Sequence, residues 1–195
     1  ERAQAVPADA GTPPWKSLWS TLQNKAFVRL LIAYLVANLS FALIKTLMAY
    51  FLQYQLNMAA ETTAVMGLML VCVTVSLFGW KKLSEKIAKG PAYAAGRFLG
   101  ALAVALTIFL PHEKTPLIYA IAVLAGLGFG AQWIFPWAMV ADVSDYDRAK
   151  SGEQRSGMYY GVWGLATKFS EALAIAASGW SLTGVGYVPN VEQTS

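Results

Sequence analysis

Five long apolar segments limit the folds that are open to this chain. They cover about residues 26–56, 62–79, 93–111, 116–141 and 157–182. A helix needs about 20 mostly apolar residues to cross the ~30 Å hydrocarbon core of a bilayer, and each segment approaches or exceeds that length. The segments lack the regular apolar–polar alternation of membrane β-strands. The sequence therefore predicts an all-α membrane protein with five transmembrane helices.

The charge content and the rare metal-binding residue types exclude several function classes. Charged residues make up 13% of the chain, whereas soluble domains carry about 25%. The net charge of +4 does not indicate a nucleic-acid partner, because the basic residues are not gathered on one soluble face. The single cysteine, Cys72, lies in an apolar run and the single histidine, His112, in a short turn. We therefore expect no metal cluster, no cofactor and no enzyme.

The positions of Lys and Arg predict the orientation in the membrane. Those at one set of segment ends are Arg2, Lys16, Lys25, Arg29, Lys81, Lys82, Lys86, Lys89, Arg97, Arg148, Lys150 and Arg155. The opposite ends have Lys114, and Lys45 and Lys168 lie inside segments. Because basic loops stay in the cytoplasm, we expect cytoplasmic loops at 80–92 and 142–156. The protein is then a multi-pass protein of the inner (plasma) membrane.

The ends of the chain read as connections. Residues 1–25 predict a cytoplasmic linker followed by a short interfacial segment, since Pro, Ala and Gly come first and Trp15 and Trp19 follow. Residues 26–182 form the membrane part, and 183–195 read as an extracytoplasmic loop. An odd number of spans between two loops indicates a piece of a longer protein.

Small residues recur at helical spacing in three of the segments. The pairs are Gly96 and Gly100, Gly126 and Gly130, and Gly157 and Gly161. Such pairs let helix backbones approach closely in a bilayer, so we interpret them as packing positions. Pro136, inside the fourth segment, is expected to kink its helix.

Lys168 and Glu171 place charge deep in the fifth segment. Lys168 lies about 17 Å from the cytoplasmic end at 1.5 Å per residue, near the bilayer midplane. Glu171 shares its face, and Gly161 and Gly164 leave space beside the amine. Intramembrane charge usually marks a substrate or ion path. A solvated ligand cavity is our interpretation, and a structural Lys–Glu pair is the alternative. Lys45, nearer the outer end of its segment, is expected to reach the interface.

A second charged cluster follows the fourth segment. Asp142 and Asp145 lie at the end of that segment and Arg155 at the start of the next. Ion pairs between them would hold the cytoplasmic face closed and break on opening, which predicts a gate. A simple solvated loop is the alternative.

These residues resemble a known family. The run Met139 to Asp142, then Asp145 and Tyr146, then Gly157 and Lys168, is similar to the glycoside–pentoside–hexuronide:cation symporters (melibiose permease-like carriers of the major facilitator superfamily), as is the tail at 186–193. The resemblance covers nearly the whole chain from about Trp15.

The resemblance implies a fold of two six-helix halves, of which this chain matches helices 7–11, with the N-terminal half and the last helix missing. It implies that Lys168 and Trp133 bind the substrate and that Asp142, Asp145 and Arg155 form a cytoplasmic charge cluster. We add Glu171 and Trp163 to the expected substrate-binding residues. The acids that bind the coupling cation, Na⁺, Li⁺ or H⁺, are expected mainly in the missing half.

The sequence therefore predicts part of a cation-coupled symporter for a sugar or glycoside, working by alternating access within the lipid bilayer. One alternative is a carrier of lysolipids or other amphiphiles, which would show an apolar groove that reaches the lipid. The other is a non-transporting scaffold or sensor, in which Lys168 is buried against Glu171 without a cavity.

Overall fold

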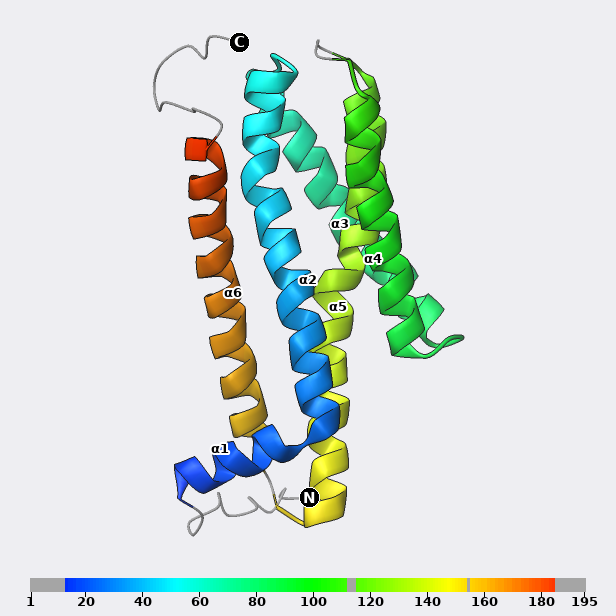
Figure 1. Ribbon diagram of the computed structural model, residues 1–195. Helices are drawn as coiled ribbons and strands as arrows, with labels where there is room; N and C mark the ends of the chain where they lie inside the picture. The colour runs from blue at the N-terminus through cyan, green and yellow to red at the C-terminus, as the bar shows by residue number, and fades with distance from the viewer. Residues whose placement is uncertain (1–12, 112–114, 154, 185–195) are drawn as a thin grey trace.

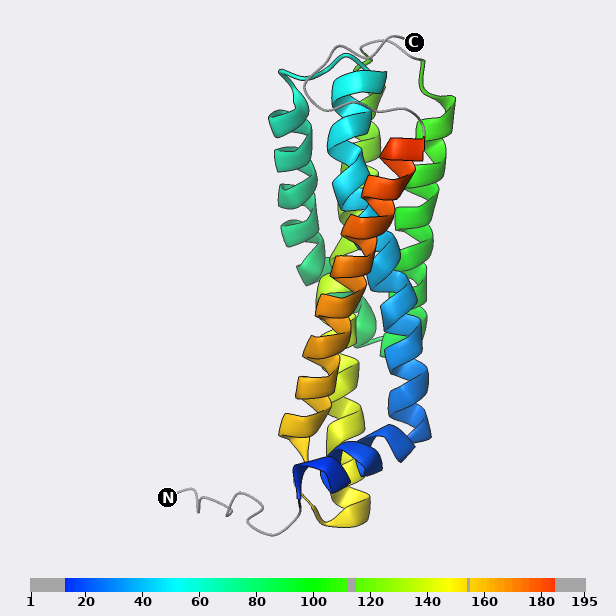
Figure 2. The same cartoon turned by 60° about the vertical axis from the view of Figure 1, so that its left-hand side comes forward.

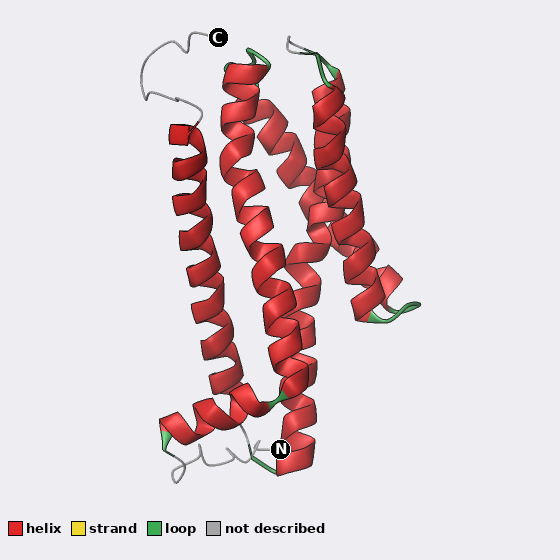
Figure 3. Cartoon of the chain, viewed as in Figure 1, coloured by secondary structure: helices red, strands yellow, loops and turns green. Residues whose placement is uncertain are grey.

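The regular structure of the described residues is helical throughout. The computed structural model describes residues 13–111, 115–153 and 155–184, and its regular elements are all helices (Figure 3). The predicted all-α membrane fold is confirmed. Most of the expected linker, His112, Lys114 and the tail at 186–193 lie outside the described residues.

Six α-helices follow one another along the chain. They are α1 (Pro14–Gln23), α2 (Lys25–Tyr50, continued by the π-helix η1, Phe51–Gln55), α3 (Thr62–Ser84), α4 (Lys89–Leu106, continued by the 3₁₀ turn η2, Thr107–Phe109), α5 (Leu117–Ser151) and α6 (Ser156–Gly184). In the described residues, the helices from α2 to α5 are long and apolar enough to cross a membrane. α6 has 29 residues but carries Lys168 and Glu171 and is not among those four, so the expected count of five is approximate.

Helix α5 is the centre of the bundle, as Figures 1 and 2 show. α3 and α4 pack closely on its first half, and α6 pairs mainly with α2. Glycines make the α5 contacts possible. A Cβ at Gly100 would lie 2.8 Å from the Phe129 ring, and one at Gly126 would lie 2.6 Å from the Met69 carbonyl oxygen. Two of the predicted glycine pairs therefore lie at close helix contacts.

The third glycine pair does not lie at a contact between described helices. A Cβ at Gly157 or Gly161 would meet no atom within 4 Å. The start of α6 packs through Tyr159 and Trp163, which are both buried. Because these two large rings fill that helix face, the small residues fall on a face that no described helix covers.

Both expected basic loops are shorter than predicted. α3 continues to Ser84 and α4 begins at Lys89, while α5 continues past Ala141 to Ser151. Polar residues at the end of an apolar segment can continue the helix, because the helix satisfies their backbone N–H and C=O groups. A hydropathy pattern identifies only the apolar part, so it does not predict such extensions. α5 ends where Gly152 takes a left-handed φ of 74°. Its amide donates to the Arg148 carbonyl at 2.9 Å, a common helix end.

α1 lies across the ends of α2 and α6 at the base of the bundle (Figure 1). One face exposes Trp15, Leu18, Trp19 and Leu22, while Thr21 is fully buried. An apolar face of this composition fits the boundary between lipid headgroups and acyl chains. We call this end of the molecule, with α1 and the α5–α6 connection, the basic end.

Candidate functional site

A cavity of about 670 Å³ lies among α2, α3, α5 and α6. Its lining combines residues from the middle of α2, α5 and α6 with residues from the first half of α3. They are Tyr34, Asn38, Phe41, Ala42 and Lys45 of α2; Thr62, Thr63, Met66, Gly67, Met69, Leu70 and Val73 of α3; Phe129, Gln132, Trp133 and Trp137 of α5; and Thr167 and Glu171 of α6. This volume suits a small molecule.

The lining differs from helix to helix. The α3 part is mostly apolar, with Met66, Met69, Leu70 and Val73. The α2, α5 and α6 parts contribute the amides of Asn38 and Gln132, the amine of Lys45, the carboxylate of Glu171 and two indole rings. The cavity is therefore amphipathic. Most of its surface is apolar, and the hydrogen-bonding groups are few and lie mainly on the α2, α5 and α6 sides.

Three of the four predicted binding residues lie at or beside this cavity. Trp133 and Glu171 line it, and Trp133 is 56% exposed. Lys168 Nζ donates to Glu171 Oε2 at 3.0 Å, and the Lys168 side chain is 80% exposed. A Cβ at Gly161 or Gly164 would meet nothing within 4 Å. The pair is therefore not a buried structural link between described helices.

The position of Trp163 corrects the expectation of direct contact. Its side chain is fully buried and stacks on Tyr34 with ring centroids 4.0 Å apart. Tyr34 lines the cavity, so Trp163 lies behind it. The reason is helix geometry: Trp163 and Lys168 are five residues apart, which turns them about 140° from each other. Its Nε1 is a buried donor without a partner in the described residues.

Two polar links between α2 and α6 were not predicted. Tyr34 Oη and Thr167 Oγ1 are 3.2 Å apart, and Asn38 Nδ2 donates to Ser170 Oγ at 2.7 Å. The available signal was Asn38, a polar amide inside an apolar segment. Lys45 also differs from expectation, because it lines the cavity as well as being exposed.

Arg97 is placed inside the bundle, which sequence reasoning missed. Its Nη2 donates to the Ala37 carbonyl at 3.1 Å, and its Nη1 donates to Gln132 Oε1 at 3.4 Å. Tyr93 Oη donates to the same Gln132 oxygen at 2.6 Å. From the sequence, Arg97 was expected among the basic residues at the cytoplasmic ends of the segments. The two tertiary contacts show that it reaches inward from α4.

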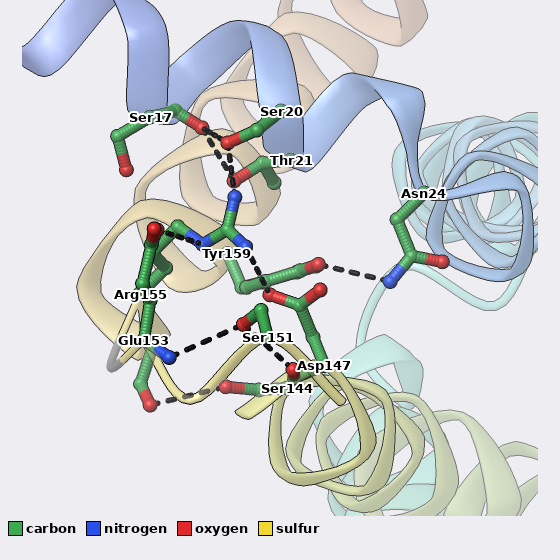
Figure 4. A network of polar contacts seen from close by, with 11 residues as sticks. Ser17, Ser20, Thr21, Asn24, Ser144, Asp147, Ser151, Glu153, Arg155 and Tyr159 are labelled. Carbon is green, nitrogen blue, oxygen red and sulfur yellow. Dashed lines mark hydrogen bonds and ion pairs between the residues drawn. The ribbon is translucent and has the colours of Figure 1, made fainter. Parts of the chain in front are cut away.

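At the basic end, Arg155 is the centre of a polar network (Figure 4). Its guanidinium pairs with Asp147 at 3.4 Å and with Glu153 at 3.2 Å. It also donates to the hydroxyl of Ser20 on α1. Beside it, Asn24 Nδ2 donates to Tyr159 Oη at 2.9 Å. We call Ser20, Asp147, Glu153 and Arg155 the Arg155 network. It ties α1 to both ends of the α5–α6 connection.

The partners within the predicted gate differ from expectation. Asp142 pairs with Lys89 at 2.6 Å, which joins α5 to the start of α4. Asp145 is exposed, and in the described residues Arg155 pairs with Asp147 in its place. Because α5 is helical here, Asp145 and Asp147 point about 160° apart. Only Asp147 faces the start of α6.

The described residues contain no group of three His, Cys, Asp or Glu side chains that would hold a metal ion. Glu171 is the acid that lines the cavity, and it is already paired with Lys168.

Comparison with known proteins gives a family and several relatives. A family model described as "MFS/sugar transport protein" matches residues 2–195. An uncharacterised symporter of Synechocystis sp. is 26% identical over 180 residues, which cover 92% of this chain and 33% of that protein. A putative sulfoquinovose importer of Escherichia coli is 29% identical over 189 residues, 92% of this chain and 38% of the importer.

A vertebrate relative is named for a different transported substrate. The sodium-dependent lysophosphatidylcholine symporter 1 of Xenopus tropicalis is 23% identical over 175 residues, 89% of this chain and 33% of that protein. The chain thus spans about a third of the length of the curated relatives it matches.

Proposed function

The chain belongs to the MFS/sugar transport protein family, and from this premise we propose that it forms part of a secondary active transporter. The carrier moves a sugar or glycoside together with a cation, Na⁺, Li⁺ or H⁺, by alternating access. In this proposal the chain supplies helices 7–11, residues 1–25 link it to an N-terminal half, and residues 183–195 lead to a last helix. The protein acts in the inner (plasma) membrane and not as an enzyme.

The observation that supports transport most directly is the cavity among α2, α3, α5 and α6. It lies at the middle of α2, α5 and α6 and along the first half of α3, and a carrier holds its substrate near the midplane between two halves. Trp133 and Trp137 offer indole faces to it, while Asn38, Gln132 and Glu171 offer hydrogen-bonding groups. A sugar ring has apolar C–H faces and polar hydroxyls at its edges, so it matches both kinds of lining. Lys168, held at 3.0 Å by Glu171, is placed to donate to substrate hydroxyls.

A second candidate substrate class is an amphiphile such as a lysolipid. The observation that favours it is the apolar α3 side of the cavity, with Met66, Met69, Leu70 and Val73. Acyl chains would pack on such a surface, and the relative from Xenopus tropicalis is named a lysophosphatidylcholine symporter. Its name also includes sodium dependence, which agrees with coupling to a cation in either case.

Ligand-induced stabilisation of the full-length protein separates these candidates. A ligand that binds the folded state at 100 times its Kd stabilises that state by about 2.7 kcal/mol. We expect sugars such as melibiose or sulfoquinovose to raise the melting temperature of the purified protein, and more strongly with Na⁺ or Li⁺ present. Stabilisation by lysophosphatidylcholine alone would favour the amphiphile carrier. A scaffold would respond to neither ligand class.

We further propose that the Arg155 network, together with Asp142 and Lys89, forms a gate at the cytoplasmic face. Arg155 joins α1, α5 and α6 through Ser20, Asp147 and Glu153. The Arg155 side chain is 10% exposed and that of Asp147 is 17% exposed. Breaking the pair in place would therefore leave two poorly hydrated charges without a partner. Opening of this face requires Arg155 and Asp147 to separate. The strength of this ion pair therefore affects the equilibrium between the closed and the open cytoplasmic face.

A charge swap tests this gate. We expect Asp147→Arg alone to reduce uptake at least about tenfold, because it places two cations together in a poorly solvated site. Adding Arg155→Asp should restore a substantial part of the rate. The matched control is Asp145→Arg with Arg155→Asp, since Asp145 lies on the other face of α5. Equal rescue of both single reversals by Arg155→Asp would show that no specific pair exists. Uptake by full-length protein in whole cells is the measurement.

A further inference from the structure

The side chain of Gln132 is held from behind the cavity by two residues of α4. Tyr93 Oη donates to Gln132 Oε1 at 2.6 Å, and Arg97 Nη1 donates to the same oxygen at 3.4 Å. Two donors on one oxygen define which end of the amide is the oxygen. The amide nitrogen of Gln132 therefore points away from Tyr93 and Arg97.

The amide nitrogen of Gln132 is left available to the cavity. Gln132 is only 6% exposed, yet it lines the cavity. Among the described residues no group accepts a hydrogen bond from its Nε2, and Nε2 is not one of the fully buried atoms without a partner. A donor that is exposed in a cavity and has no protein partner is suited to an acceptor on a ligand.

The positive charge of Arg97 lies close to the Gln132 amide. Its hydrogen bonds go to two neutral oxygens, those of Ala37 and Gln132, and it forms no ion pair with an acid in the described ranges. A charge-assisted hydrogen bond to the carbonyl oxygen of an amide polarises the amide and strengthens its N–H as a donor. Lys45 is a cation of the cavity lining itself, whereas Arg97 lies behind Gln132, and the charge of Glu171 is balanced by Lys168.

We propose that Tyr93 and Arg97 position Gln132 so that its amide donates to an acceptor oxygen of the transported molecule, and that the charge of Arg97 favours an anionic oxygen. The preferred substrate is then a sugar-like molecule with a carboxylate, sulfonate or phosphate group. This inference rests on the proposed function, in which the cavity holds the transported molecule. Tyr93 and Arg97 are positioning residues, because they act through Gln132.

Three sugars that differ at C6 test this proposal: glucose, glucuronate and sulfoquinovose. Their Kd values are measured by calorimetry on the purified full-length protein. We expect the wild type to bind glucuronate or sulfoquinovose more tightly than glucose. Arg97→Gln should reduce that preference at least about tenfold, the size of one lost charge-assisted hydrogen bond. Tyr93→Phe should weaken binding of all three sugars a few-fold, because the amide is then held by Arg97 alone.

Gln132→Glu provides a variant that keeps the shape of the site. The carboxylate can still accept from Tyr93 and Arg97, but it turns the donor toward the cavity into an acceptor. We expect anionic sugars to be rejected while the melting temperature stays near that of the wild type. If Arg97→Gln does not fold, this variant carries the test. Arg29→Gln and Tyr146→Phe, which alter exposed residues outside the cavity, are the matched controls.

The outcomes separate this inference from the proposed function. Wild-type protein that binds none of the three sugars would overturn sugar transport and this inference together. Wild-type protein that binds glucose as tightly as the two anions would overturn the inference alone. An unchanged ratio of anionic to neutral Kd values in both Arg97→Gln and Gln132→Glu would do the same, because a purely structural role for Arg97 leaves that ratio unchanged.

Discussion

Replacing Lys168 with alanine in the full-length protein is expected to abolish cation-coupled uptake, with a loss of about 100-fold or more. The amine donates to Glu171 at 3.0 Å, and Glu171 lines the cavity, so a charged donor lies beside the proposed substrate site. A hydrogen bond from a charged group contributes about 1.5–3 kcal/mol, so losing two such bonds to a substrate accounts for that factor. Radiolabelled sugar uptake in cells, normalised to the amount of protein in the membrane, is the measurement.

Two companion variants make the Lys168 result specific. Lys86→Ala removes an exposed lysine in the α3–α4 connection and should leave uptake near the wild-type level. Glu171→Gln removes the acid partner but leaves the amine, and we expect a smaller loss than in Lys168→Ala. The Lys168 side chain is 80% exposed in this chain, so its removal should hardly change the melting temperature. Uptake that survives Lys168→Ala would disprove a role of this lysine in the substrate site.

Gly128→Ala is expected to separate α4 from α5 and to destabilise the protein. A Cβ at Gly128 would lie 2.8 Å from the Gly100 Cα and 2.9 Å from the Gly96 carbonyl oxygen. These are backbone atoms, so no side-chain rotation can relieve the contact and one helix must move. Overpacking of this kind costs about 1–3 kcal/mol. Thermal unfolding of the full-length protein in detergent, followed by tryptophan fluorescence, measures the loss.

The matched control for Gly128→Ala is Gly79→Ala in α3. A Cβ there would meet nothing within 4 Å, and alanine is favoured over glycine in a helix by about 1 kcal/mol. We expect Gly79→Ala to melt at or slightly above the wild-type temperature. If both variants had the same melting temperature, the close packing of α4 on α5 at Gly128 would not contribute to stability.

Much of the fold could be predicted from the sequence because the bilayer restricts it. Apolar length alone indicated the helices, and Gly96, Gly100, Gly126 and Gly130 indicated close helix contacts that the structure contains. The helix ends at the basic end could not be predicted in this way. Hydropathy reports lipid contact, whereas the last turns of α3 and α5 lie beyond the apolar segments and are held by backbone hydrogen bonds.

The residues of the candidate site were also predicted only in part from the sequence. Lys168 and Glu171 stood out because charge in an apolar segment is costly and therefore rare, and the motif around them led to the family. Tyr93 and Arg97 gave no such signal, because an arginine near a segment end is ordinary. Trp163 was expected to contact substrate, yet it is buried behind Tyr34.

What the sequence determined by itself was the membrane class, the family motif and the two charged regions, since each depends on local composition and spacing. What only the tertiary structure decided was which side chains meet. Arg155 pairs with Asp147 and not with Asp145, and Gln132 is held by two residues of another helix. The physical reason is that helix rotation and crossing, set by packing of the whole bundle, select one partner among several that the sequence places within reach.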